Sequence, residues 1–282
     1  MTVVFGVRLS LLAVCVVLLA ACGASETPEQ TAGRIATAGG LLARRIATSH
    51  FDLAAYERIV RGTDRIRIYI EGDGHSWRTR TQPSDDPTPW DPVALALASR
   101  DDVASVAWLG RPCQYAVPMP AACRQNLWTN ERYGELVIGS MNEAVDQIRA
   151  QAAASHVELV GFSGGGVVAA LIAARRTDVV SLRTVAANLD TGAWSASNGL
   201  SPLTGSLNPA NLAGELAALP QIHFVGGMDT VVAPSVVEAF ASRFGSRTCL
   251  EIVSIANAGH GDGWTEIWPR LVRREPKCVH PA

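Results

Sequence analysis

Short apolar runs of strand length alternate with longer runs of helical periodicity along most of the chain. Runs that are β-branched or that alternate in polarity predict strands at 45–56, 65–70, 103–109, 156–160, 179–187, 221–225 and 249–255. Apolar positions at helical spacing predict helices at 92–100, 130–154, 167–176, 235–244 and 265–273. Strands that are regularly separated by helices indicate an α/β fold, with a mostly parallel central sheet, right-handed crossovers and helices on both faces.

The junction between the strand at 156–160 and the helix at 167–176 reads Gly161-Phe162-Ser163-Gly164-Gly165-Gly166. Glycine accepts positive φ and lets other backbone approach closely, so this segment permits a sharp strand-to-helix turn. Such a turn exposes a serine hydroxyl above the edge of the sheet, at a helix N-terminus that favours negative charge. Because a G-x-S-x-G pattern is weak by itself, the flanking strand and helix carry the prediction that Ser163 is a nucleophile.

The first 23 residues have the pattern of an export signal rather than of a folded element. Arg8 precedes an apolar run at 9–19 that is too short to cross a bilayer as a helix. The run ends in Leu19-Ala20-Ala21-Cys22-Gly23, which resembles a bacterial lipobox, whose cysteine becomes the lipidated first residue. An ordinary secretory signal with a chance cysteine and a short anchor that stays attached are the alternatives.

We therefore expect a lipoprotein signal peptide at 1–21, a lipid anchor on Cys22, a small and polar tether at 22–40, and one folded domain at 41–282. The roughly 260 residues after the signal are enough for one large α/β domain. The lipobox resemblance implies a bacterial cell envelope, at an outer membrane facing the periplasm or at the cell surface. A membrane is thus an expected partner, reached through the N-terminal lipid.

The amino-acid composition excludes some classes of protein and gives no support to others. An apolar content of 48% excludes extended disorder, and a net charge of −2 gives no reason to expect nucleic acid as a partner. Four cysteines follow the lipid site, and in an exported domain they suggest two disulfides, with three pairings open. We favour Cys113–Cys123, which closes a Pro-rich loop, and Cys249–Cys278, which ties a late strand to the C-terminal segment. Their spacing is not that of a metal site, and we expect neither a metal nor an organic cofactor.

Three polar residues, Ser163, Asp229 and His260, each follow a predicted strand. Residues just past the carboxyl ends of parallel strands gather at one edge of a sheet, so we expect these side chains to meet. The order Ser…Asp…His resembles the α/β-hydrolase superfamily over roughly 45–272. The resemblance implies Ser163 as the nucleophile, His260 as the general base and Asp229 as the acid that orients it. Asp190 also ends a strand and is the alternative acid.

The same resemblance implies an oxyanion hole made of two backbone N–H donors. Gly164, directly after the nucleophile, supplies one, and Asp73 in the segment Glu71-Gly72-Asp73 supplies the other. Glu71 stands where the family usually has histidine, which leaves its hydrogen bonding open. A Gly-Asp-Gly turn without contact to the site is the alternative. Because Asp73→Ala keeps the N–H, we expect it to lower activity far less than Ser163→Ala.

These residues predict a membrane-anchored serine hydrolase, esterase-like, that takes a small-molecule ester or acyl substrate through an acyl-enzyme on Ser163. A peptidase or amidase of the same fold and a non-catalytic binding lipoprotein are the alternatives. Trp77, Trp128 and Trp194 are candidates for lining an apolar acyl pocket. Residues 191–216 form a connection that is long enough to be a lid or an ordered insertion.

The lipobox makes a prediction that can be checked in cells. Cys22→Ser removes the thiol that would carry the lipid, so metabolic labelling of the protein with palmitate should disappear. Labelling that persists in the variant would contradict the lipoprotein assignment, and Cys15→Ser, within the apolar run, serves as the control that keeps the label.

Overall fold

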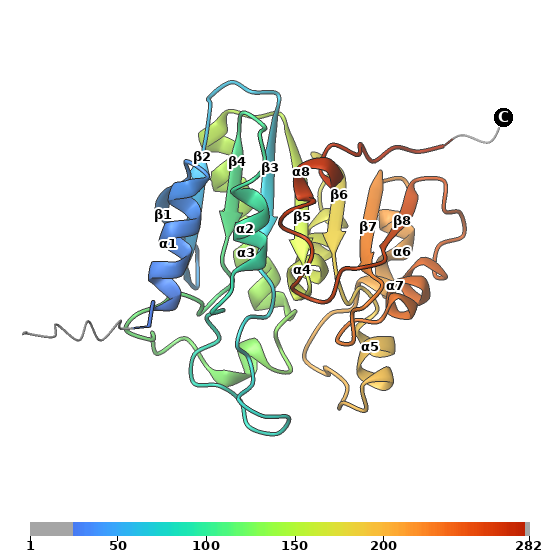
Figure 1. The fold of residues 1–282 in the computed structure, drawn as a ribbon, viewed down its shortest axis with the longest axis horizontal. Helices are drawn as coiled ribbons and strands as arrows, with labels where there is room; N and C mark the ends of the chain where they lie inside the picture. The colour runs from blue at the N-terminus through green and yellow to red at the C-terminus, as the bar shows by residue number, and fades with distance from the viewer. Residues whose placement is uncertain (1–24, 280–282) are drawn as a thin grey trace, which may run out of the picture.

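Eight strands form one central sheet: β1 (Leu42–Ala47), β2 (Asp52–Arg58), β3 (Arg65–Ile70), β4 (Val106–Leu109), β5 (His156–Phe162), β6 (Val179–Val185), β7 (Gln221–Gly226) and β8 (Leu250–Ile255). The computed structural model describes residues 25–279, so the predicted signal peptide and Cys22 lie outside the described residues. The strand order is β1-β2-β4-β3-β5-β6-β7-β8 (Figure 1). β2 is antiparallel to β1 and to β4, and every other pair of neighbours is parallel.

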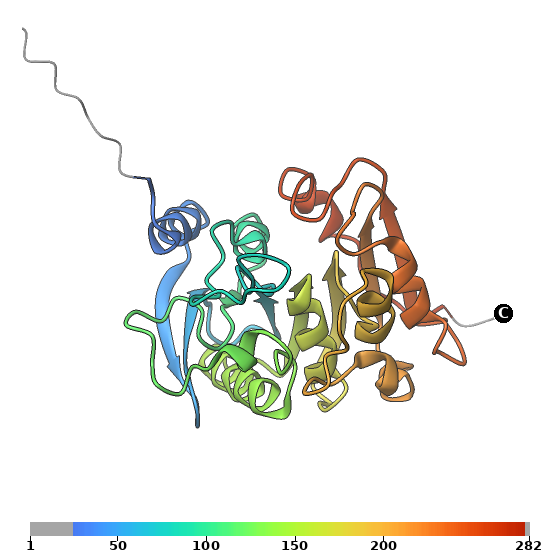
Figure 2. The ribbon, with the colours of Figure 1, turned by 90° about the horizontal axis from the view of Figure 1, so that it is seen from below.

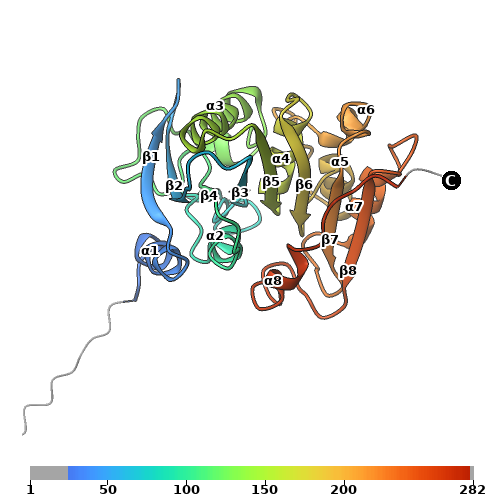
Figure 3. The same cartoon turned by 90° about the horizontal axis from the view of Figure 1, so that it is seen from above.

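Helices cover both faces of this sheet, as the alternation of elements predicts, and each face has its own hydrophobic core (Figures 2 and 3). The helices on one face are α1 (Pro28–Ala38), α2 (Val93–Ala98) and α8 (Trp268–Leu271). Those on the other face are α3 (Glu135–Ala152), α4 (Gly164–Ala173), α6 (Ala213–Leu216) and α7 (Pro234–Ala241). The connections also hold η1 (Gln125–Trp128), α5 (Thr191–Ser197) and η2 (Pro209–Leu212). None of the helices between residues 25 and 279 has the length and apolar character needed to cross a membrane.

Alternation along β3 shows how the strands serve both cores. Its isoleucines enter the core beneath α3 and α4, while Tyr69 enters the opposite one and accepts a hydrogen bond from the Trp268 indole at 2.9 Å. Arg67, between Ile66 and Ile68 in the strand, is also buried, and it pairs with Asp101 at 2.8 Å and with Glu158 at 2.7 Å. Two carboxylates thus compensate a buried cation in a strand that the sequence pattern identifies only as alternating.

Residues 28–38, which the sequence pattern assigns to a tether, form helix α1, so that part of the prediction is wrong. Thr27 and Gln30 build a capping box at the start of the helix. Ala32 and Ala36 are buried in the core that α1 shares with α2. Small residues resemble a linker in sequence, yet here they let two helices approach closely, and the folded domain therefore already includes this segment.

The structure contains both favoured disulfides, Cys113–Cys123 and Cys249–Cys278. The first closes the loop after β4, and the second ties the C-terminal segment to the start of β8. The last helix is shorter than the predicted 265–273, because Pro269 is tolerated only in the first turn and the helix begins next to it.

Candidate active site

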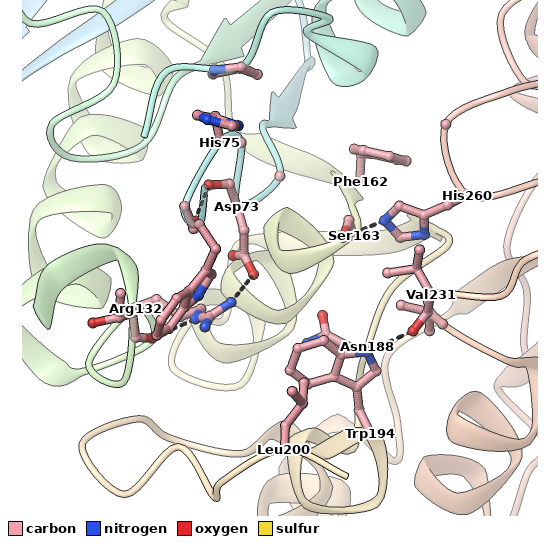
Figure 4. A pocket seen from close by; sticks show the side chains of 18 of the residues that line it. Asp73, His75, Arg132, Phe162, Ser163, Asn188, Trp194, Leu200, Val231 and His260 are labelled. Atoms are coloured by element: carbon pink, nitrogen blue, oxygen red, sulfur yellow. Dashed lines mark hydrogen bonds and ion pairs between the residues drawn. The ribbon is translucent and has the colours of Figure 1, made fainter. Parts of the chain in front are cut away.

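The three residues expected to meet do so at the carboxyl edge of the sheet, and Figure 4 shows two of them, Ser163 and His260, side by side. Ser163 follows β5, Asp229 follows β7 and His260 follows β8. The His260 Nε2 atom lies 3.0 Å from Ser163 Oγ, and its Nδ1 atom lies 2.9 Å from Asp229 Oδ2. The distances are those of a hydroxyl, an imidazole and a carboxylate in a continuous hydrogen-bonded chain.

Ser163 occupies a strained corner between β5 and α4. Its φ of 51° and ψ of −125° are rarely adopted by residues other than glycine. A Cβ at Gly161 would lie 2.4 Å from the Gly165 carbonyl oxygen, and one at Gly165 would lie 2.2 Å from the Ile70 carbonyl oxygen. Only glycine fits at both positions, and this tight turn directs the serine hydroxyl away from the sheet (Figure 4).

Asp229 and His260 are each held by groups outside the hydrogen-bonded chain. The buried Asp229 carboxylate accepts the N–H groups of Val231 and Val232, both at 2.8 Å, through its Oδ1 atom. This leaves Oδ2 for His260. The Trp264 indole donates to the His260 carbonyl oxygen at 3.0 Å and steadies the loop after β8. The imidazole itself is partly exposed, toward the cavity above Ser163.

Asp190, the alternative acid, has a different task. Its Oδ1 atom accepts the N–H groups of Gly192 and Ala193, at 3.1 and 3.0 Å, and thereby caps the N-terminus of α5. Asn208 donates to the same oxygen at 3.1 Å. The structure therefore places Asp229, and not Asp190, against the imidazole of His260.

The two expected oxyanion donors belong to neighbouring segments. Gly164 is the first residue of α4, where a backbone N–H has no acceptor within the helix. The Asp73 N–H has no acceptor among residues 25–279. A Cβ at Gly164 would lie 2.0 Å from Asp73 Oδ1, so the two segments are in direct contact beside Ser163. Among residues 25–279 neither N–H group has an acceptor, and their role as oxyanion donors stays a prediction.

Glu71, at the position of the family's usual histidine, organises the backbone on one side of Asp73. Its buried carboxylate accepts the Gly72 N–H and the Trp108 indole N–H, both at 2.9 Å. It also accepts the N–H groups of Ala94 and Leu95 at the start of α2, at 3.4 and 3.3 Å. Burial raises the pKa of Glu71, although the four N–H donors oppose that shift.

The Asp73 side chain lies in a cluster of charges that sequence reasoning missed. Its carboxylate pairs with Arg132 at 2.7 Å (Figure 4). It also pairs with Arg111 and accepts the Tyr133 hydroxyl at 2.9 Å. Burial by itself would raise the pKa of Asp73, but the two guanidinium groups and the Tyr133 hydroxyl lower it below its usual range. Asn188 completes the cluster by donating to the Tyr133 oxygen at 3.3 Å.

This cluster changes the expectation for Asp73→Ala. The side chain was expected to matter little, because the substitution keeps the backbone N–H. In the structure its loss would leave Arg111 and Arg132, both nearly buried, without their shared carboxylate. The two arginines come from loops after β4 with no motif around them, so only their positions in space could identify them.

A cavity of about 920 Å³ opens above Ser163 and His260. Trp77 and Trp194 line it as expected, whereas Trp128 does not, because it is buried and donates its indole N–H to the Ser84 carbonyl oxygen at 3.1 Å. Trp90 also lines the cavity and was not among the candidates. Within residues 25–279 no group of three or more His, Cys, Asp or Glu side chains is placed to hold a metal ion.

Residues 191–216 form one wall of this cavity. They fold into α5, η2 and α6, and Trp194 and Leu203 face the cavity. The Trp194 indole donates to the Val231 carbonyl oxygen at 2.8 Å (Figure 4), and the Leu207 N–H donates to the Tyr133 carbonyl oxygen at 3.1 Å. These bonds attach the segment to both sides of the site, and movement of the segment as a lid stays a prediction.

Proteins similar to this chain are found by comparing structures, and not by comparing sequences. No protein-family model matches the sequence, and no curated protein matches it. Among solved structures, Est1E from Butyrivibrio proteoclasticus is 16% identical, with a TM-score of 0.56 over 82% of this chain and 96% of that one. The Pyrococcus furiosus esterase Pf2001 is 15% identical, with a TM-score of 0.56 over 83% of this chain and 90% of that one.

A puromycin hydrolase, in a mutant form complexed with PGG, is 16% identical and has a TM-score of 0.59. The match covers 82% of this chain and only 37% of that longer protein. Together with the sheet order, these likenesses show that the chain has the α/β-hydrolase fold.

The charge cluster predicts a large cost for removing the Asp73 carboxylate. Asp73→Ala should lower the free energy of unfolding by about 3–5 kcal/mol, because it leaves two buried cations without their partner. Asp85→Ala, which removes an exposed carboxylate paired with Arg78, is the matched control and should cost less than about 1 kcal/mol. Urea denaturation of both variants measures the difference, and equal effects would contradict the structural role of Asp73.

Proposed function

We propose that this chain is a serine hydrolase that cleaves carboxylic esters through an acyl-enzyme on Ser163. The observation that carries the proposal is the hydrogen-bonded chain from Ser163 through His260 to Asp229 beneath an open cavity. The hydroxyl, imidazole and carboxylate are placed for the three tasks that acyl transfer requires. The likeness in fold to esterases supports the same reaction class.

In the first half of the reaction, Ser163 Oγ attacks the ester carbonyl carbon while His260 Nε2 takes the hydroxyl proton. Asp229 accepts the His260 Nδ1–H, holds that tautomer and stabilises the imidazolium. The carbon–oxygen bond then breaks, and His260 returns the proton to the leaving alcohol. In the second half, water attacks the acyl carbon while His260 Nε2 takes its proton. The bond between the acyl carbon and Ser163 Oγ then breaks, His260 returns the proton to Oγ, and the carboxylic acid leaves.

The negative charge that forms on the carbonyl oxygen needs donors that are already in place. The N–H groups of Gly164 and Asp73 supply them, and the N-terminus of α4 adds its positive end of the helix dipole. Glu71 holds the Gly72 N–H, and the arginines hold the Asp73 carboxylate, so the Asp73 N–H keeps its direction without reorganising during the reaction. Asp73 thus contributes its backbone to the oxyanion and its side chain to positioning.

We further propose that the enzyme is lipid-anchored through Cys22 in a bacterial cell envelope. The lipobox resemblance at 19–23 supports this location. Helix α1, which packs on the domain through Ala32 and Ala36, starts six residues after Cys22, so the domain would lie close to the membrane that holds its lipid.

An amidase or peptidase activity is the alternative within the same fold, and the likeness in fold to a puromycin hydrolase supports this alternative. The Ser–His–Asp arrangement can cleave both esters and amides, so only activity on substrates of each kind distinguishes the two functions. A non-catalytic binding protein is the alternative outside enzymes.

A fluorophosphonate probe separates an enzyme from a binding protein, because it reacts only with an activated serine. We expect stoichiometric labelling of the wild-type chain and none of Ser163→Ala, with hydrolysis of an ester falling by roughly three orders of magnitude or more. Ser155→Ala, at the other end of β5, should label normally. A folded wild-type chain without Ser163-dependent labelling would refute the hydrolase proposal.

A series of p-nitrophenyl esters tests the ester preference and the apolar wall of the cavity. Each methylene buried against Trp194 and its neighbours should raise kcat/KM by about three- to fourfold until the cavity is full. The matching p-nitroanilide should react more slowly than the ester of the same acyl group. A faster anilide, or kcat/KM that falls from the shortest ester onward, would favour the amidase alternative or a polar substrate.

A further inference from the structure

Three apolar side chains stand at the mouth of the cavity, where they both line it and face solvent. Trp77 is 38% exposed, Trp90 is 60% exposed and Val231 is 44% exposed. We call these three residues the mouth rim. Large apolar side chains are usually withdrawn from water, and a cluster of them around an opening indicates a surface that contacts something apolar. Tryptophan in particular favours the boundary between water and lipid.

Hydrogen bonds hold the two sides of the rim together. Arg80, in the turn after Trp77, donates to the Asn198 carbonyl oxygen at 3.2 Å. Asn198 in turn donates its side-chain amide to the Val231 carbonyl oxygen at 3.4 Å. The rim therefore belongs to one connected surface, which runs from the loop after β3 across the end of α5 to the loop after β7.

The topology places the start of the described chain at the same edge of the molecule. β1 is antiparallel to β2, which is antiparallel to β4, so β1 runs in the direction of the parallel strands and begins at their amino edge. Helix α1 leads into β1 and therefore starts at the opposite, carboxyl edge, the one that carries the cavity (Figure 1). Pro28 follows Cys22 by six residue steps along the chain, a reach of at most about 21 Å.

The charges around the mouth rim do not attract this surface to anionic lipid. Residues 77–91, which include both rim tryptophans, have two arginines and three aspartates, and Arg78 already pairs with Asp85. A surface without excess positive charge has no preference for anionic lipid. Contact with a bilayer would then depend on insertion of the rim side chains, and it would be insensitive to salt.

We propose that the mouth rim docks onto the bilayer that holds the N-terminal lipid, so that the cavity takes an acyl ester resident in that bilayer. The proposal rests on the proposed hydrolase function and names its substrate class. The anchor limits the distance to the membrane, and the rim sets the orientation by placing the cavity mouth against the lipid. The ester can then pass from the acyl region to Ser163 without crossing water.

Tryptophan fluorescence tests the docking directly. The full lipidated chain is reconstituted in phosphatidylcholine vesicles with and without phospholipid brominated on its acyl chains, which quenches tryptophan on contact. We expect strong quenching of the wild-type chain, unchanged at high salt, and loss of most of it in Trp77→Phe/Trp90→Phe. Phenylalanine keeps the apolar contact, so this variant removes only the reporters. Trp90→Phe alone, at the most exposed rim position, should lose part of the quenching and is the smaller change if the double variant is unstable.

A second measurement links docking to the substrate. The ratio of turnover of a vesicle-resident ester to that of a water-soluble ester should fall about tenfold in Trp90→Asp. Val60→Asp is the matched control, because Val60 is 52% exposed beyond the end of β2, at the amino edge of the parallel strands. Its ratio should equal that of the wild type.

Equal quenching of the wild type and the double phenylalanine variant, or no association of the wild type with vesicles, would overturn the docking proposal. An equal fall of the turnover ratio in Trp90→Asp and Val60→Asp would overturn it as well. Fluorophosphonate labelling of Ser163 in the same samples reports the hydrolase proposal independently. Labelled chains without quenching leave an enzyme that does not dock, whereas quenched chains without labelling leave a docked protein that is not this enzyme.

Discussion

The turn between β5 and α4 constrains everything around it, because it has to hold Ser163 in a backbone conformation that costs free energy. A positive φ at a serine persists only where the surrounding structure leaves no alternative. Here β5 is buried in the centre of the sheet and α4 is buried along its whole length, so both ends of the turn are fixed. The glycines let α4 approach the backbone of β3 closely enough to keep the turn tight.

Two carboxylates, the buried Glu71 and the partly exposed Asp73, lie on either side of Gly72 and have opposite electrostatic surroundings. Glu71 is satisfied by neutral N–H donors, and burial raises its pKa. Asp73 is satisfied mainly by Arg111 and Arg132, which lower its pKa. The first carboxylate fixes the loop to α2, and the second fixes it to the loops that follow β4. A single short segment is thereby held from both sides, next to Ser163, where the proposed oxyanion hole needs an N–H that points in one direction.

The carboxyl edge of the sheet collects more than the reactive groups. The loops after β3, β6 and β7 meet there and enclose the cavity, and α1 begins at the same edge. The antiparallel strand β2 is responsible for the last feature, since it reverses the direction of the chain between β1 and β4. A simple change in strand direction thus brings the N-terminal end of the domain to the side that carries the site.

The sequence by itself determined the α/β alternation, the strand that leads to Ser163 and the order of Ser163, Asp229 and His260. It favoured the two disulfides but left three pairings open, and the structure decided between them. Periodicity, glycines and residues at strand ends are local signals, and the parallel sheet converts order along the chain into proximity at one edge. Only the tertiary structure decided that Asp229 rather than Asp190 faces the imidazole, because both follow strands and differ only in the helix that Asp190 caps. It also decided that α1 is part of the domain and that Arg111 and Arg132 surround Asp73. Burial and charge pairing depend on which loops meet in space, and such distant contacts leave no periodic trace in the sequence.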